Sequence, residues 1–315
     1  MKKIVFFIIL FVASGTAKPQ TTTPLAQYSG NQMIFNPGFA GVHDLFSANL
    51  SLRRLWMGIP GAPTLISLNM HAPFIDHRNA LGFIYQRETF GPQFINLINL
   101  AYAYKIHVGA ESFLNLGMQA GLFNSVTDWG MVEYVRHPED PAYGYDNRLQ
   151  TNSLDLSFGL HFQTRNFYLG LSARHLTAPK FDEITDVEIE RTIYSRVPRQ
   201  FFLMGGYNIT LTDALDLRPR ILMRYKKGTP FTVSTGIDII YNNRFSFGAN
   251  YMTGLPVITL SAGIEVVQGL KVGYAFDMNY GVLRPFQRGS HEISINYFMR
   301  VWTRANEKQA KQYFI

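Results

Sequence analysis

Cysteine is absent from this chain of 315 residues. Its absence excludes disulfide bonds, thiolate metal sites and cysteine nucleophiles. Beyond the N-terminus the chain also lacks any long hydrophobic run, because polar residues and glycines interrupt every apolar stretch. No stretch approaches the roughly 20 residues that a membrane-spanning helix needs. We therefore expect stability to come from hydrogen-bonded strands and from the packing of the 25 Phe, 17 Tyr and 3 Trp side chains.

Familiar catalytic signatures are missing as well. There is no G-x-S-x-G nucleophile elbow, no H-E-x-x-H zinc helix and no G-x-x-x-x-G-K phosphate loop. The histidines are dispersed, and the one close pair, His71 and His77, fits turn and lumen polarity better than a metal site. The formal charge of +7 is modest and spread out, which does not indicate nucleic-acid binding. We expect a protein that is not an enzyme and uses no cofactor, metal or nucleic acid.

The N-terminus has the three parts of a secretory signal. Lys2 and Lys3 supply the positive start, residues 4–13 form an apolar stretch, and residues 15–17 are a small-residue cleavage site. Such a segment is removed during export. We therefore predict a signal peptide over residues 1–17 and a mature chain that begins near Lys18.

An alternation of apolar and polar residues dominates the rest of the chain, from about Leu45 to Trp302. In one representative run the apolar face holds Leu215, Leu217, Ile221, Met223 and Tyr225, and the polar face holds Asp216, Arg218, Arg220 and Arg224. A period of two indicates a strand with one apolar and one polar side. Recurring behind an export signal, it predicts an all-β outer-membrane β-barrel, whose exterior faces lipid and whose interior is polar. The alternative is a soluble secreted β-sandwich or propeller.

The runs predict about 14 antiparallel strands, an even number as in bacterial outer-membrane barrels. They lie near residues 45–56, 64–72, 80–88, 94–106, 112–122, 150–162, 166–174, 200–209, 215–226, 230–240, 244–253, 256–266, 270–280 and 290–301. Every second connection is short, and the other set includes the long segments 123–149 and 175–199. Because such barrels have short periplasmic turns and longer external loops, we expect these long segments outside the cell, where the second is a possible docking surface.

Two further expectations concern the interior and the chain ends. Residues 18–44 precede the barrel wall (45–302) and are too broken for a strand, so they lie in the periplasm or plug the lumen, and residues 303–315 form a periplasmic tail. The inner wall should carry Asp155, Arg218, Arg220, Arg224, Asp238, Glu265, Lys271, Asp277, Glu292 and Arg300. Charges of both signs fit a filled, ion-paired lumen as well as a water-filled one.

Three motifs resemble one known family. The stretch 26–41 contains Asn36, Pro37 and Gly41 and is similar to its "Q-Y … N-P-A-Y-A-G" opening. The stretch 53–64 is similar to "R-x-Q-W-x-G-x-x-G-A-P-x-T", with Leu55 in place of the usual Gln. A closing match spans 289–292. In order and extent these motifs resemble the PorP/SprF family, outer-membrane proteins of the type IX secretion system of Bacteroidota.

The resemblance implies a role in binding without catalysis. Family members are partners of secreted cargo, such as adhesins, that carries a type B C-terminal sorting domain, and they contact the secretion or gliding machinery. It implies an outer-membrane location with a periplasmic C-terminus. The motif positions that could contact a partner are Asn36, Pro37, Gly41, Trp56, Gly58, Gly61, Pro63 and His291. For the segment 56–63, a tight turn that needs its glycines and prolines is the alternative role. The alternative function is a channel for small or hydrophobic solutes.

Overall fold

The structure is a computed structural model that describes residues 25–74, 77–131, 148–186, 191–254, 257–281 and 284–300. The predicted signal peptide, the C-terminal tail and much of the first long loop lie outside these residues. No helix within the described ranges is long and apolar enough to cross a membrane.

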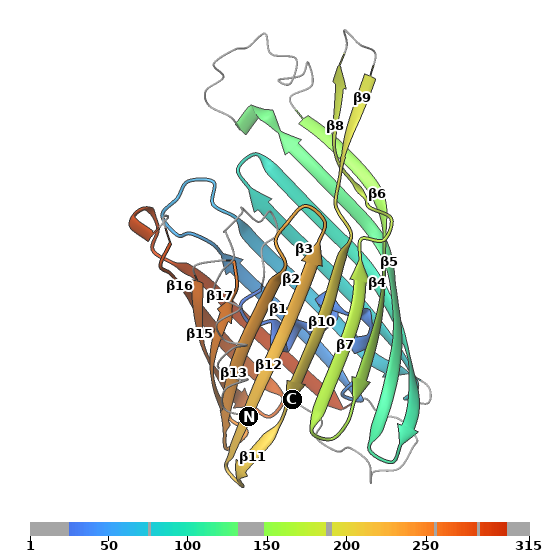
Figure 1. Ribbon diagram of the computed structural model, residues 1–315, viewed down its shortest axis with the longest axis vertical. Coiled ribbons are helices and arrows are strands. Elements are labelled where there is room, and N and C mark those ends of the chain that lie inside the picture. Colours follow the sequence, from blue (N-terminus) through green and yellow to red (C-terminus); the bar gives the residue numbers. More distant parts are fainter. Residues whose placement is uncertain are drawn as a thin grey trace, which may run out of the picture.

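The described residues form a closed antiparallel barrel, as the sequence predicts (Figure 1). Its wall strands are β1 (Leu45–Arg54), β2 (Thr64–Phe74), β3 (Asn79–Phe90), β4 (Gln93–Gly109), β5 (Ser112–Asp128), β6 (Arg148–Gln163), β7 (Phe167–Arg174), β10 (Gln200–Tyr207), β11 (Ile209–Thr212), β12 (Leu215–Lys226), β13 (Thr232–Tyr241), β14 (Phe245–Met252), β15 (Val257–Val267), β16 (Leu270–Asn279) and β17 (Ser290–Arg300). β1 pairs with β17, and β10 pairs with β12, which closes the ring. Because β10 and β11 follow β12 in one register, the wall has fourteen strands.

A proline accounts for the break between β10 and β11. The shared register places Tyr207 opposite Pro219. Proline has no N–H and cannot complete the ladder of hydrogen bonds there. Next to the break, Arg218 Nε donates a hydrogen bond to Asn208 Oδ1 at 2.8 Å. The two segments therefore act as one wall strand.

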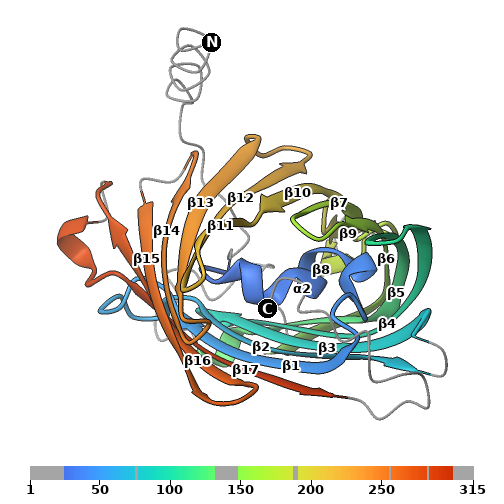
Figure 2. The same ribbon diagram turned by 90° about the horizontal axis from the view of Figure 1, so that it is seen from below.

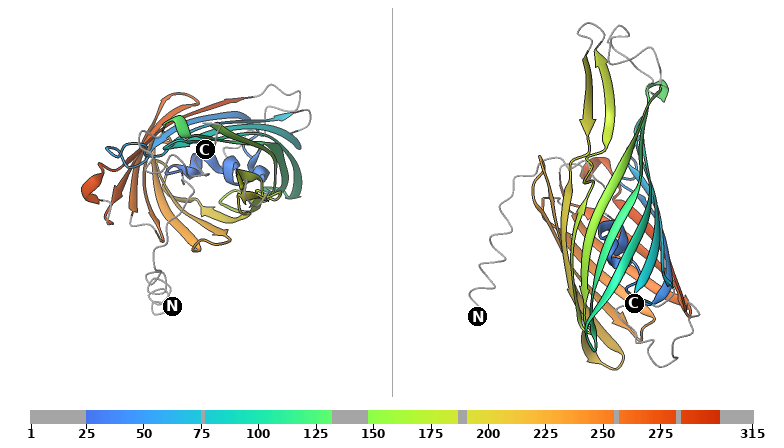
Figure 3. Two further views of the ribbon diagram at one scale, coloured as in Figure 1. Left: turned by 90° about the horizontal axis from the view of Figure 1, so that it is seen from above. Right: turned by 90° about the vertical axis from the view of Figure 1, so that its right-hand side faces the viewer.

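The long connections differ from the prediction in two places. β5 continues to Asp128 and β6 begins at Arg148, so both ends of the predicted loop 123–149 are strand. Within the predicted loop 175–199, β8 (Lys180–Asp186) and β9 (Arg191–Arg196) pair as a separate hairpin, which rises beyond the barrel rim (Figure 3). These segments leave the lipid-facing zone, so they need no apolar side, and the alternation that marks the other strands is weak there.

The predicted faces of the wall strands are confirmed. Phe247 and Tyr274 point outward and are 54% and 45% exposed, whereas Asp277 and Glu292 point inward and are 4% and 0% exposed. Exposed apolar side chains encircle the barrel, as lipid contact requires. We call the rim that carries the β1–β2, β5–β6, β7–β10 and β16–β17 connections the long-loop rim, and the opposite one the short-turn rim.

Residues 25–44 lie inside the lumen, and we call them the plug (Figure 2). The plug contains η1 (Tyr28–Asn31), α2 (Gln32–Phe35) and η2 (Pro37–Phe39), and then leads into β1. The buried apolar core lies between the plug and the inner wall: Met33, Ile34 and Val42 of the plug pack with Ile84 and Met204 of the wall. Of the two placements that the sequence left open for this segment, the structure shows the lumen.

Candidate functional site: a plugged lumen

Asn36 shapes the centre of the plug. Its side-chain Oδ1 accepts a hydrogen bond from Gly38 N at 2.9 Å and so caps η2, while Pro37 occupies the first position of that turn. Asparagine at the cap and proline next to it are the favoured residues for such a start. Asn36 Nδ2 donates to the carbonyl of Leu160 on β6 at 2.8 Å. One buried side chain therefore shapes the plug and ties it to the wall.

Glycines on the inner wall make room for this turn. A Cβ atom at Gly117 of β5 would lie 2.2 Å from Gly38 N and 2.3 Å from Pro37 C. At Gly159 of β6 it would lie 1.9 Å from Asn36 Oδ1. Both separations are far below contact distance, so any side chain at these positions would displace the plug.

A buried ion-pair network holds the start of the plug. Arg53 of β1 bonds to Asp277 of β16 and, at 3.1 Å, to Glu292 of β17. Glu292 also accepts hydrogen bonds from the backbone N–H groups of Ala26, at 2.7 Å, and Gln27, at 3.0 Å. The side chains of all three charged residues are at most 6% exposed. Because each buried charge here depends on its partners, the plug and three wall strands are held as one unit.

Further polar contacts join the rest of the plug to the wall of β2, β4, β5 and β7. Ser172 Oγ donates to Phe35 O at 2.6 Å, Asn115 Nδ2 to Ala40 O at 3.2 Å, Gly41 N to His71 Nδ1 at 3.2 Å, and Lys105 Nζ to Asp44 Oδ1 at 2.5 Å. Buried polar groups that are paired in this way fix one arrangement of neighbouring segments. The plug is therefore attached along its length, from Ala26 to Asp44.

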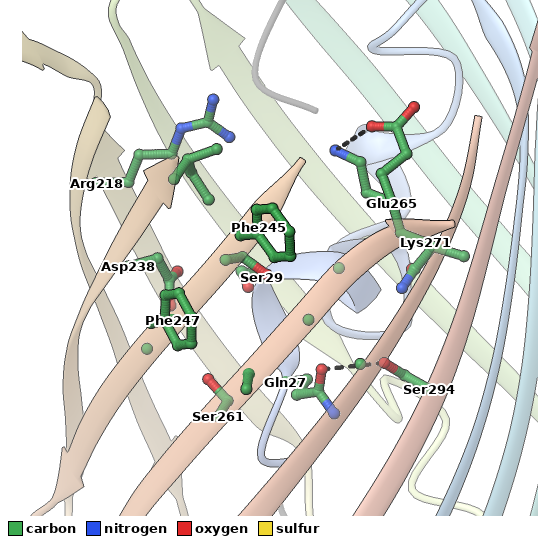
Figure 4. Close-up of a pocket in the computed structure, with 18 of the residues that line it drawn as sticks. Gln27, Ser29, Arg218, Asp238, Phe245, Phe247, Ser261, Glu265, Lys271 and Ser294 are labelled. Atoms are coloured by element: carbon green, nitrogen blue, oxygen red, sulfur yellow. Dashed lines mark hydrogen bonds and ion pairs between the residues drawn. The ribbon is translucent and has the colours of Figure 1, made fainter. Parts of the chain in front are cut away.

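The opposite side of the lumen contains a cavity of about 190 Å³. Arg218 and Asp238 face it from β12 and β13, and Glu265 and Lys271 face it from β15 and β16 (Figure 4). The Lys271 Nζ and Glu265 Oε2 atoms are 3.9 Å apart. Ser246, Gly248, Ser261 and Gly263 line it as well. The cavity therefore combines charges of both signs with apolar side chains, among them Phe39, Ile240 and Phe298.

Tyr28 of the plug packs against the wall at Arg220 of β12. The Arg220 guanidinium lies 4.5 Å from the centre of its ring, and Arg220 Nε bonds to Asp238 Oδ2 at 2.6 Å. Burial raises the pKa of the Tyr28 phenol, and the nearby positive charge of Arg220 partly opposes that rise. Tyr28 is therefore a neutral packing group against an ion pair.

The eight predicted contact positions fall in three separate places. Asn36, Pro37 and Gly41 lie in the buried plug. Trp56, Gly58, Gly61 and Pro63 lie in the β1–β2 loop at the long-loop rim. His291 stands on the outer face of β17, where its Nδ1 is 2.6 Å from Tyr274 Oη. The structure does not bring these positions together into one site.

The β1–β2 loop is bonded to both of its neighbours. Met57 N donates to Gly289 O at 2.8 Å, and Gly91 N donates to Gly61 O at 2.9 Å. Gly58 has φ of +101°, and Trp56 has φ of +44°, which is unusual for a residue with a large side chain. The loop is thus a turn that backbone hydrogen bonds hold on both sides, and Trp56 adopts a strained backbone conformation within it.

Sequence reasoning missed Arg53 as the cation of the buried ion-pair network, and it missed Asn115 and Ser172 as direct partners of the plug. Arg53 follows the polar inward positions Ser47, Asn49 and Ser51 at intervals of two, so the phase of β1 could have placed it inside. Within the part of the chain that the structure describes, no group of three His, Cys, Asp or Glu residues could hold a metal ion.

Comparison with known proteins gives one family. The model of the family described as "Type IX secretion system membrane protein PorP/SprF" matches residues 17–297. No curated protein matches the chain. Similar solved structures include the Ralstonia pickettii toluene transporter TbuX, with 11% identity, 85% of this chain and 92% of that chain covered and a TM-score of 0.49. A Pseudomonas aeruginosa FadL homologue has 14% identity, coverages of 91% and 100%, and a TM-score of 0.47. Because the family match spans most of the chain, the protein belongs to the PorP/SprF family of type IX secretion system membrane proteins.

Proposed function

We propose that this outer-membrane barrel assists the export or surface attachment of a secreted cargo protein that carries a type B C-terminal sorting domain. It acts by binding and catalyses no reaction. Membership of the PorP/SprF family carries the proposal. The plug supports it, because a lumen occupied by a segment bonded to the wall from Ala26 to Asp44 suits a fixed anchor.

Cargo contact belongs at the long-loop rim in this proposal. β4, β5 and β6 extend there as a raised sheet, and the β8–β9 hairpin continues it. We place this rim outside the cell and the short-turn rim, where β17 ends at Arg300, in the periplasm within reach of the secretion or gliding machinery. Trp56 is the first candidate for contact, because strained backbone conformations cluster at functional positions. The motif positions of the plug would act indirectly, by holding the barrel in one shape.

Deletion of the gene tests this function. We expect one large sorting-domain protein to disappear from the cell surface or to be lost to the medium. The wild-type gene should restore it, and a gene encoding Trp56→Ala should restore less. Phe231→Ala is a matched control, because Phe231 is an exposed aromatic residue (54%) of the β12–β13 loop at the same rim. Unchanged secretion in the deletion strain would contradict the proposal.

The cavity beside β12–β16 favours a second candidate, a channel for small or hydrophobic solutes. Its walls join serines and charged groups with aromatic and aliphatic side chains, which a small solute with polar and apolar parts would tolerate. Conduction would require the cavity to connect both rims past the plug. Electrical recording distinguishes this function from cargo binding, and the two hypotheses predict opposite results.

A further inference from the structure

The outer face of the barrel shows where the lipid ends. On each of β4, β5 and β6, five successive outward-facing residues are apolar. They are Ile98, Leu100, Tyr102, Tyr104 and Ile106 on β4; Leu114, Leu116, Met118, Ala120 and Leu122 on β5; and Leu154, Leu156, Phe158, Leu160 and Phe162 on β6. Nine residues of strand span about 26 Å. Tilted by about 40°, they cover about 20 Å of membrane, close to the apolar band of such barrels.

On all three strands, an asparagine is the first outward-facing residue beyond this apolar band on the side of the long-loop rim. Asn96, Asn124 and Asn152 are register neighbours. Asn96 Nδ2 donates to Asn124 Oδ1 at 3.0 Å, and Asn124 Nδ2 donates to Asn152 Oδ1 at 2.8 Å. A ladder of amides directly above lipid-facing side chains marks the level of the membrane surface.

Arginines continue the same level on the neighbouring strands. Arg87 of β3 pairs in register with Asn96 and lies over the ring of Phe94, 5.4 Å from its centre. Arg54 of β1 stands just beyond the last apolar outward residue of its strand, Leu52, and pairs with His291 of β17. The strands tilt relative to the membrane, so residues at the same height are not always register partners. Between β1 and β3 the residues at this height therefore belong to different pairs of register partners. We call the set of Arg54, Thr64, Arg87, Asn96, Asn124, Asn152 and His291 the polar collar.

The β16–β17 loop adds to the collar beside β1. Its short turn η5 (Arg284–Phe286) projects outward from the barrel wall (Figures 1 and 2). Phe286 is 70% exposed, and Arg284 and Arg288 on either side of it are exposed. The loop is fixed in place, because Arg288 N donates to Met57 O at 2.7 Å. An aromatic side chain between two arginines, held beside the lipid-facing wall, suits the boundary between acyl chains and headgroups.

The charge of this surface has one sign. The collar contains no Asp or Glu. Among the described residues, the ion pairs that the structure contains do not involve Arg54, Arg87, Arg284 or Arg288. Four arginine guanidinium groups that have no carboxylate partner in the described ranges are suited to phosphate at the membrane surface, because arginine binds phosphate in a bidentate manner.

We propose that the polar collar and the β16–β17 loop bind lipid headgroups of the outer leaflet that bear phosphate and a net negative charge. Arg54, Arg87, Arg284 and Arg288 contact the phosphates, the asparagines contact neighbouring polar groups, and Phe286 enters the acyl boundary. The contact fixes the height of the barrel, so that the extended ends of β4–β6 and the β8–β9 hairpin stand clear of the membrane. The proposal rests on the outer wall alone and is independent of cargo.

Native mass spectrometry of the mature protein with phosphatidylglycerol or phosphatidylcholine tests the headgroup contact. Wild type should bind the anionic lipid in preference, and R54Q/R87Q/R288Q should lower this preference about a hundredfold, since each of the three surface arginines contributes on the order of a fivefold effect. The control R165Q/K227Q/R244Q removes the same charge at exposed positions elsewhere and should keep the preference. An unchanged preference in the collar variant, or equal loss in both variants, would overturn the proposal.

Spin labelling supplies a second test that leaves the arginines intact. Because the chain has no cysteine, F286C and K227C each give a single labelling site. In phosphatidylglycerol-containing vesicles the label at 286 should collide with oxygen more than with a water-soluble nickel chelate, and the label at 227 should show the reverse. Equal exposure of both labels to the nickel chelate would overturn the insertion of residue 286. Heat-modifiable migration on gels confirms that each variant is a folded barrel.

Discussion

The two sides of the lumen are built differently. On the side of β5 and β6 the plug backbone lies against Gly117 and the side chains of Asn36 and Pro37 lie against Gly159, with no space for one added carbon. On the side of β14 and β15, a Cβ at Gly263 would meet only the Ser246 hydroxyl within 3 Å, beside a cavity. Two ion pairs of the inner wall also differ in exposure, although both networks include a residue of β16. Arg53 and Glu292 are 4% and 0% exposed, whereas Lys271 and Glu265 are 28% and 23% exposed. The β5–β6 side packs closely against the plug, and the β14–β15 side contains free volume.

The largest effect should come from Arg53→Ala. The substitution leaves Glu292 and Asp277 buried without their shared cation, and removal of one partner from a buried pair costs about 3–5 kcal/mol. Urea unfolding of the detergent-solubilised barrel, followed by tryptophan fluorescence, should show this decrease in the free energy of unfolding. A change below about 1 kcal/mol would mean that the network does not hold the plug.

Gly117→Ala should have the next largest effect. Its methyl group would lie against plug backbone atoms, which cannot rotate away, and overpacking of this kind costs about 1–3 kcal/mol. Gly263→Ala is the matched control on the cavity side and should change the free energy of unfolding by less than about 0.5 kcal/mol. Equal effects of the two substitutions would remove the contrast between the two sides.

Asn36→Ala should produce a smaller and more local change. It removes the hydrogen bonds to Gly38 N and Leu160 O, each worth about 1 kcal/mol. Hydrogen–deuterium exchange should be faster for the plug peptide that contains Gly38 and unchanged for the strands of β12–β15. Uniformly faster exchange throughout the barrel would show that Asn36 supports the whole fold.

Lys271→Ala should have the smallest effect. Partly exposed ion pairs contribute about 0–1 kcal/mol, and the Lys271–Glu265 pair lies beside the cavity. The same urea titration measures the loss. A decrease as large as that from Arg53→Ala would show that the cavity side is as tightly constrained as the plug side.

The wall could be read from the sequence because its chemistry is local. Lipid selects an apolar residue at every second position, so the run 215–226 is identified and bounded as observed. The rule fails where lipid is absent. The ends of β5 and β6 and the β8–β9 hairpin lie beyond the apolar band, so the alternation predicts loops where the structure has strands.

The contacts between the plug and the inner wall could not be predicted in this way, because the residues that make them are far apart in the sequence. Ala26 N and its acceptor Glu292 are 266 residues apart, and no local pattern links them. The sequence did place Asp277 and Glu292 inside, and it identified Asn36 and Pro37 as a motif. The reason for Gly117 and Gly159 becomes visible only when the plug lies against them.

Single-channel recording in planar bilayers tests the central claim most directly, since a plugged barrel that works by binding should not conduct. We expect the purified mature protein to give no stable open level, and we expect Arg53→Ala to give intermittent openings as the plug loosens. A large and stable conductance of the wild-type protein, unchanged by Arg53→Ala, would contradict both the plug and the binding role.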